Sequence, residues 1–157
     1  MGVQTSYTVD HVVGYAGSVV DSSLKNIISK MVETGPISQG LAVTRGTGDN
    51  QVLKATATGA DFMGVAVATT AGQADSLDAF EYQEDSAINL LGFGRIYVIC
   101  ENGCVPGDAV FFRHTVGTGS VIGAFRTDAD TATADEITNA TFESTAGAGE
   151  LAILQLS

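Results

Sequence analysis

Short apolar runs separated by glycine-rich or polar turns recur along most of the chain, and this pattern is typical of β-strands. Residues 41–45 and 51–55 form two such runs, and residues 46–50 between them predict a hairpin turn. Gly64, inside the apolar run at 62–67, indicates a bulge or a close approach of the backbone. The other predicted strands cover residues 88–91, 95–100, 110–112, 141–143 and 151–156. About nine or ten short strands at this spacing predict an all-β single domain, either a β-sandwich or a barrel.

The stretch at residues 105–130 has the pattern of a further hairpin. Pro106 presets φ and Gly107 tolerates a positive φ, so the chain is expected to turn before the β-favouring run that follows. A glycine-rich turn at residues 117–119 then leads into an apolar run that closes on Arg126. This pattern predicts architecture, because a strand that feeds a turn is not a catalytic motif.

One segment has a pattern that fits two kinds of element. Its apolar residues are spaced as on one face of a helix, and Gly35-Pro36 would end that helix. These apolar residues are Leu24, Ile27, Ile28, Met31 and Val32. The surrounding chain is strand-like, so helix and strand both stay open for residues 24–34.

Three stretches lack the pattern of a regular element. Glycine and serine interrupt residues 1–23, which predict an extended N-terminal arm that precedes a β-rich domain at 24–157. Acidic and amide residues crowd residues 72–85, which predict a solvated loop. Residues 127–139 are small, polar and acidic, and they predict a long exposed loop.

Composition narrows the possible functions. The 157 residues suit one domain, and 18 acidic against seven basic residues give a formal net charge of −11. Because the acidic residues are spread along the chain, its surface should repel phosphate backbones and anionic lipids, which argues against direct nucleic-acid or membrane binding. Cys100 and Cys104 lack further Cys or His at metal-ligand spacing, and no export signal is visible, so we expect two small buried or half-buried thiols.

The sequence contains no recognisable catalytic motif. It lacks a phosphate-binding glycine loop, an H-E-x-x-H zinc motif and a G-x-S-x-G nucleophile turn. Arg113 and His114 are interpreted as the end of a strand that faces solvent or a partner. Asp128 and Asp130 are interpreted as solvated loop acids, because the rest of a calcium loop does not follow them. We therefore expect a non-enzymatic protein without a metal site or cofactor.

An ordered set of motifs resembles the head cement, or decoration, proteins of tailed bacteriophages. The motifs are G-x-G-R-I-Y-V at 92–98, V-P-G-D-A-V-F at 105–111, R-H-T-x-G-x-G at 113–119 and G-A-F-R-T-D-A-D at 123–130, with further matches at 29–43 and 62–67. The resemblance covers nearly the whole chain and implies a strand within residues 24–34. It also implies a virion protein, made in the host cytoplasm, that binds the outer surface of the head and clamps neighbouring major capsid protein subunits as a homo-oligomer, either a dimer or a trimer.

Two groups of residues are candidates for contact with such a partner. The first is the N-terminal arm, with Tyr7, His11 and Tyr15, because arms of this kind often become ordered against a partner. The second is the hairpin surface around Arg113, His114 and Arg126, because cations are few in this chain and these cluster around one hairpin. The alternative function is a carbohydrate- or receptor-binding β module of a virion, although exposed aromatic side chains would then be expected.

Overall fold

The structure, a computed structural model, describes residues 14–69, 73–74 and 80–157, and within these it contains twelve strands and no helix. The strands are β1 (Asn26–Thr34), β2 (Ile37–Ser38), β3 (Ala42–Arg45), β4 (Gln51–Lys54), β5 (Phe62–Ala66), β6 (Gln73–Ala74), β7 (Phe80–Tyr82), β8 (Ala87–Cys100), β9 (Ala109–Arg113), β10 (Phe125–Arg126), β11 (Ala134–Phe142) and β12 (Glu150–Leu156). The predicted all-β class is confirmed. No helix in the described ranges is long and apolar enough to cross a membrane.

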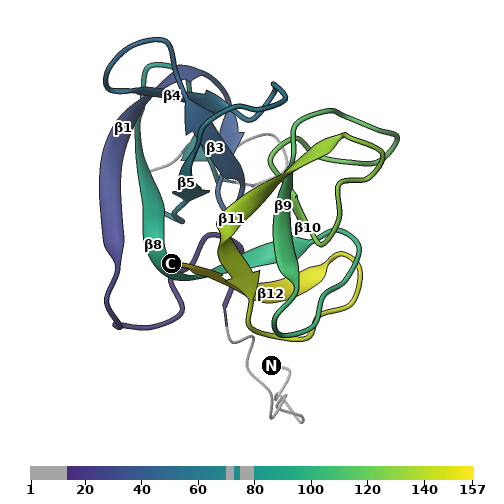
Figure 1. Cartoon of the computed structure of the whole chain (residues 1–157). Helices are drawn as coiled ribbons and strands as arrows, with labels where there is room; N and C mark the ends of the chain where they lie inside the picture. Colours follow the sequence, from purple (N-terminus) through teal and green to yellow (C-terminus); the bar gives the residue numbers. More distant parts are fainter. Residues whose placement is uncertain (1–13, 70–72, 75–79) are drawn as a thin grey trace, which may run out of the picture.

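Nine of these strands form two closed barrels that share β8 (Figure 1). The first half of β8 pairs with β1 and β5, and β4 and β3 complete that ring. The second half pairs with β12 and β10, and β11 and β9 complete the other ring. The change of partner falls between Phe93, opposite Asn26, and Gly94, opposite Leu156. Gly94 has a φ of 116°, a conformation that glycine adopts without steric cost.

Each barrel has its own core because alternate side chains of its strands point inward. In the first barrel the core includes Val32, Val43, Val52 and Leu90. In the second barrel the largest fully buried side chains are Phe112, Phe125, Phe142, Ile96, Leu154 and Leu156. Burying one such side chain contributes roughly 1.5–3 kcal/mol to stability. Each barrel buries several of them, so each has an apolar core that stabilises its closed ring of strands.

The segment whose pattern left helix and strand open is the strand β1. Ile28 and Val32 belong to the first barrel's core, whereas Ile27 and Met31 on the opposite side are exposed. Apolar residues at helical spacing therefore lie on both faces of a strand. Hydrogen bonds to β4 on one side and to β8 on the other stabilise β1 as a strand. The same two pairings close the first barrel, which would otherwise have two free edges.

The apolar runs elsewhere mostly form the strands that they predict. Strands β3 and β4 pair as the predicted hairpin, and β9 pairs antiparallel with β10, with Phe112 opposite Phe125. The register of β3 and β5 shifts beside Gly64, which confirms the predicted bulge. Gly64 has a φ of 150°, and a Cβ atom there would lie 2.6 Å from the carbonyl oxygen of Leu91, so a close backbone approach also exists.

Two predicted loops are wrong in part. The stretch at 127–139 contains most of β11, and the buried side chains of β11 within it, Ala134 and Ile137, are too few to give a strong apolar pattern. The stretch at 72–85 contains β6 and β7, and β7 pairs with β2 in a separate three-stranded sheet.

Candidate contact surface

The positions of Arg113 and Arg126 follow from the hairpin that carries them. Phe112 and Phe125 point into the second core, so the next residue on each strand points out of the barrel. Both arginines are nevertheless buried, with 4% and 7% of their surface exposed. Arg113 ends β9 as predicted, but the expectation that it faces solvent or a partner is wrong, because other side chains of the same chain cover its guanidinium.

Glu101, in the turn after β8, bridges the two guanidinium groups. Its Oε2 atom lies 2.8 Å from Arg113 Nη2 and 3.1 Å from Arg126 Nη1. Asp130 Oδ2 also contacts both arginines, at 2.7 Å from Arg113 Nη2 and 3.0 Å from Arg126 Nη1. Asp128 Oδ1 adds a contact of 2.8 Å to Arg126 Nη2. These five residues, Glu101, Arg113, Arg126, Asp128 and Asp130, form what we call the arginine network.

The arginine network presents negative charge to solvent. Its two cations are covered, whereas the side chains of Asp128 and Asp130 are 59% and 43% exposed. The hydrogen bond from Arg113 is the largest of the effects that lower the pKa of the Asp130 carboxyl. The hydrogen bond to Glu101 is likewise the main cause that raises the pKa of the Arg113 guanidinium. Asp128 and Asp130 are therefore ion-pair partners rather than isolated loop acids.

The loop that carries these aspartates makes a left-handed turn. Asp130, Thr131 and Ala132 have φ values of 40°, 57° and 64°. The N–H of Thr133 donates to the carbonyl oxygen of Ala129 at 3.0 Å and closes the turn. A left-handed conformation costs about 1–2 kcal/mol for each residue other than glycine, so other contacts must offset this strain. The bonds from Arg113 and Arg126 to Asp130 are contacts of this kind.

His114 lies inside the protein rather than on a solvent-facing strand end, with 2% of its surface exposed. Its Nδ1 atom lies 2.9 Å from Thr115 Oγ1, whereas its buried Nε2 atom has no hydrogen-bond partner. Asp135 Oδ1 lies 3.7 Å from Nε2, and Oδ2 of the same carboxylate accepts a 2.6 Å hydrogen bond from the Gly59 N–H. His114 and Asp135 therefore lie where a loop of the first barrel meets the second barrel. Within the described ranges, no group of three or more His, Cys, Asp or Glu side chains could hold a metal ion.

Of the arm candidates, Tyr15 lies in the described part of the chain, whereas Tyr7 and His11 lie outside the described residues. Tyr15 is 60% exposed and stands at the start of a segment that packs on β8. The Gly17 N–H donates to the Tyr97 carbonyl at 2.7 Å, and Val19 forms a bridge with Ile96.

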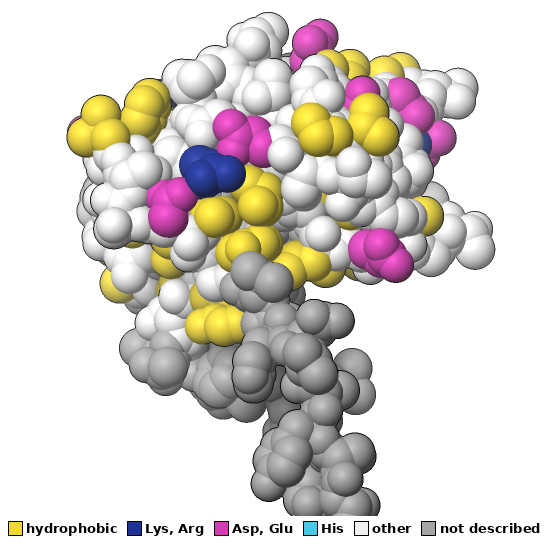
Figure 2. Space-filling view, turned by 90° about the horizontal axis from the view of Figure 1, so that it is seen from below, with side chains coloured by type: hydrophobic (Ala, Val, Ile, Leu, Met, Phe, Trp, Pro, Cys, Tyr) yellow, Lys and Arg dark blue, Asp and Glu magenta, His cyan; other side chains and the backbone are white. Residues whose placement is uncertain are grey.

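The underside of the molecule carries small separate groups of hydrophobic side chains with acidic side chains among them (Figure 2).

Comparison with known proteins identifies the family. The family model described as "Structural cement protein (E217 gp24/Pam3 gp6)" matches residues 3–157, which is almost the whole chain. The chain belongs to this family of phage cement proteins. This result confirms the resemblance inferred from the ordered sequence motifs.

One solved structure supports the fold of this cement protein. A chain from "The capsid of Myoviridae Phage XM1" superposes with a TM-score of 0.74 at 16% identity, covering 99% of this chain and 97% of that one. At this identity the likeness shows the fold alone. A chain from "The crystal structure of head fiber gp8.5 N base in bacteriophage phi29" has a TM-score of 0.47 at 15% identity, covering 85% of this chain and 95% of that one. No curated protein sequence matches this cement protein.

The surface of the cement protein also has two open grooves that sequence reasoning missed. One, of about 520 Å³, lies beside the arginine network and includes Ile99 and Val121, which are 40% and 52% exposed. The sequence of β8 contained a signal for this groove. Alternate side chains of the strand point inward, which places the apolar Ile99 on the outer face, where a polar residue would be expected.

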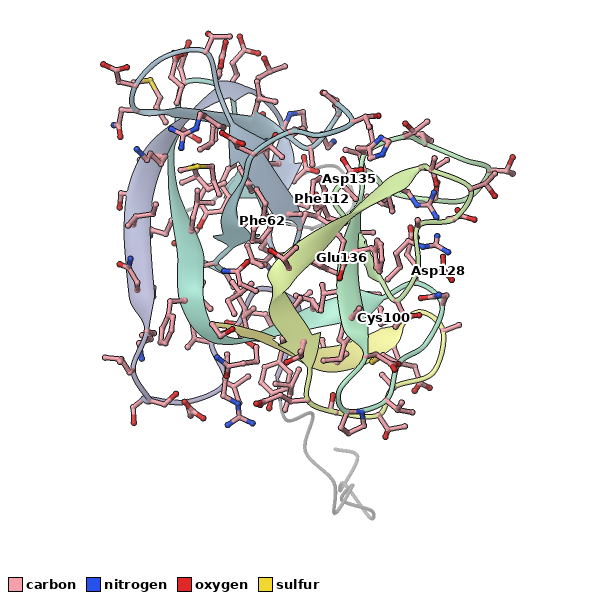
Figure 3. All side chains as sticks on the ribbon, in the orientation of Figure 1. Phe62, Cys100, Phe112, Asp128, Asp135 and Glu136 are labelled. Carbon is pink, nitrogen blue, oxygen red and sulfur yellow. The ribbon has the colours of Figure 1, made fainter. Side chains whose placement is uncertain are left out.

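The other groove, of about 480 Å³, lies between the two barrels. Phe62 and Phe112 line it with their ring centroids 5.9 Å apart, and Asp135 and Glu136 line it from β11, the strand next to β9 (Figure 3). No single stretch of sequence could indicate this groove, because its residues come from separate loops and strands.

Proposed function

We propose that this chain binds the outer surface of a phage head and joins neighbouring major capsid protein subunits. The observation that carries the proposal is the match of a structural cement protein model to residues 3–157. Such a protein works by adhesion, so the proposal includes no catalytic step, cofactor or metal. The net charge of −11 supports contact with protein rather than with packaged DNA or anionic lipid.

The closed barrels limit the ways in which the protein makes contact. Every strand of the nine-stranded sheet has a neighbour on both sides, so this sheet has no edge strand, although the first half of β11 is unpaired on the side of β12. The contacts that we propose are therefore made by side-chain surfaces and by the N-terminal arm. In this proposal residues 1–23 are the capsid-binding arm, and residues 24–157 are the folded domain that holds it in place.

Within the arm we propose Tyr7, His11 and Tyr15 as capsid contacts. On the domain we propose the surface of the arginine network, where Arg113 and Arg126 act by positioning the exposed Asp128 and Asp130, and His114 acts by supporting the neighbouring barrel junction. The assembled unit is a homo-oligomer, a dimer or a trimer, since several copies bound together hold a shell more firmly than single copies do. Analytical ultracentrifugation of the free protein distinguishes these two states.

The test is binding of the purified chain to expanded heads from a phage mutant that lacks it. Cosedimentation should show saturable binding with a fixed number of copies per head, and unexpanded proheads serve as the control for shell state. Absence of binding to expanded heads would overturn the proposal. A glycan array run with the same preparation tests the carbohydrate-binding alternative, for which specific glycan binding without head binding is the diagnostic result.

A further inference from the structure

The two cysteines lie opposite each other across a tight turn. Cys100 ends β8 opposite Glu150, and Cys104 forms a bridge with Ala146. The Glu150 N–H donates to the Gly147 carbonyl at 3.1 Å, so the chain from Ala146 to Glu150 folds back on itself. Since each cysteine is paired with one end of this turn, the two cysteines are brought close together.

The two thiols are buried in the same core. Both belong to the second barrel's core, with 0% and 5% of their surface exposed, and each thiol contributes to the pKa shift of the other. Each thiol also donates one weak hydrogen bond, from Cys104 Sγ to the Ser144 carbonyl oxygen at 3.3 Å and from Cys100 Sγ to Asn102 Oδ1 at 3.8 Å. In the structure both cysteines are free, and both are buried, as the sequence predicted.

We propose that Cys100 and Cys104 are a modification site that forms an intramolecular disulfide after the protein leaves the reducing cytoplasm. The oxidant is a low-molecular-weight disulfide of the glutathione class. The Cys100 thiolate attacks one sulfur of the oxidant, forms a mixed disulfide and releases one small thiolate. The Cys104 thiolate then attacks the Cys100 sulfur and displaces the second small thiolate. Two protein thiols lose their protons to solvent and are oxidised, and one disulfide is reduced to two thiols.

Burial determines when this reaction occurs. Desolvation raises the pKa of the Cys100 thiol and raises that of Cys104 to about 12, so thiolate is scarce in the closed fold. Oxidation therefore needs transient opening of the turn at residues 101–103. The disulfide forms slowly compared with folding and assembly, and it is slow to reverse because thiols of high pKa are poor leaving groups.

The disulfide would stabilise the arginine network as well as the turn. Glu101, which bridges Arg113 and Arg126, lies between the two cysteines. Asn102 Nδ2 donates to Thr127 Oγ1 and to Asp128 Oδ2, both at 2.9 Å. A covalent link from Cys100 to Cys104 would fix both residues and, through them, the loop that carries Asp128 and Asp130.

Incubation of the purified full chain with oxidised glutathione, followed by intact-mass measurement, tests the proposal. We expect a monomer lighter by about 2 Da, the mass of two hydrogens. Cleavage after Glu101 should leave the Cys100 and Cys104 peptides joined until dithiothreitol separates them. The oxidised chain should also melt roughly 4–8 °C higher than the reduced chain, as expected for a short closed loop in a domain of this size.

The matched controls are Cys100→Ala and Cys104→Ala, which should keep a glutathione adduct instead of losing mass. A parallel incubation in a urea concentration just below the unfolding transition speeds the opening of the turn. If the wild-type chain stays reduced in both incubations, or forms only adducts or disulfide-linked dimers, the proposal is wrong. Because the free protein is used, these results do not depend on whether the chain binds heads.

Discussion

The Arg113 guanidinium donates a 2.7 Å hydrogen bond to the carboxylate of Asp130, the first of three residues in a left-handed turn. The pair connects the end of a core strand to a strained loop, and the same carboxylate also accepts a bond from Arg126. A buried cation thus holds an exposed acidic loop in one conformation. Arg113 and Arg126 therefore do not form a contact surface themselves. They fix the conformation of the acidic loop that is exposed beside them.

Replacing Arg113 with methionine should lower the free energy of unfolding by roughly 2–4 kcal/mol, since it removes one of the two cations that pair with the partly buried carboxylate of Glu101 and the main donor to Asp130. Urea denaturation measures the change. The matched control is Arg45→Met, because Arg45 and Asp61 form an exposed pair that should contribute no more than about 1 kcal/mol. Equal losses from the two substitutions would contradict a structural role for the arginine network.

Stability should fall in acid partly through Asp130. Its pKa in the folded protein lies below the ordinary value of 3.8, so its stabilisation is complete above that value and is lost as the pH falls through the folded value. Asp130→Asn should therefore flatten the loss of stability that urea unfolding shows below about pH 4. Part of the slope should remain, because the pKa values of Asp21 and Glu33 are also lowered.

In the Arg113→Met background, Asp130→Asn should have a much smaller effect on this slope, since the main donor to the carboxylate is absent. An unchanged effect in that background would mean that another group lowers the pKa of Asp130.

Gly64→Ala should destabilise the barrel by about 2 kcal/mol or more, because the new Cβ would lie 2.6 Å from a backbone oxygen at a φ of 150°. Gly92→Ala is the matched control, since its nearest neighbour, the Met63 carbonyl oxygen, lies 3.7 Å from the new Cβ. Thermal unfolding of both variants measures the difference. A Gly92 variant as unstable as the Gly64 variant would contradict the close approach of β5 and β8.

Deleting residues 1–13 should reduce occupancy on expanded heads several-fold if the arm provides capsid contacts. The deletion keeps the segment from Gly17 to Val19 that bonds to β8, so the melting temperature of the free protein should change little. Cosedimentation at several protein concentrations measures the occupancy. Undiminished binding by a well-folded deletion variant would remove the arm from the proposal.

Much of the fold was predictable because the apolar runs are also the barrel strands. A barrel was one of the two predicted architectures, but the pair of barrels was not predictable, since it depends on one long strand, β8, whose two halves have different partners. Most of strand β11, up to its predicted end at residues 141–142, was missed because two of its four buried side chains are alanine and its outward residues are mostly polar. Local patterns report how residues alternate and carry little information about which strands pair.

The candidate site was less predictable than the fold. The sequence pattern predicted that Arg113 and Arg126 lie on one hairpin, and the structure confirms that they are neighbours. Their burial could not be anticipated, because the carboxylate that bridges them comes from a turn before the hairpin, at Glu101. A cluster of cations in an acidic chain therefore indicates internal ion pairs as readily as a contact surface.

The most direct test of a cement function is the temperature at which filled heads release their DNA. Expanded heads that lack the protein are filled with DNA, incubated with or without the purified chain, and heated with a fluorescent dye that reports free DNA. Our account predicts release at a clearly higher temperature when the chain is bound at saturation. Release at the same temperature from saturated and bare heads would contradict it.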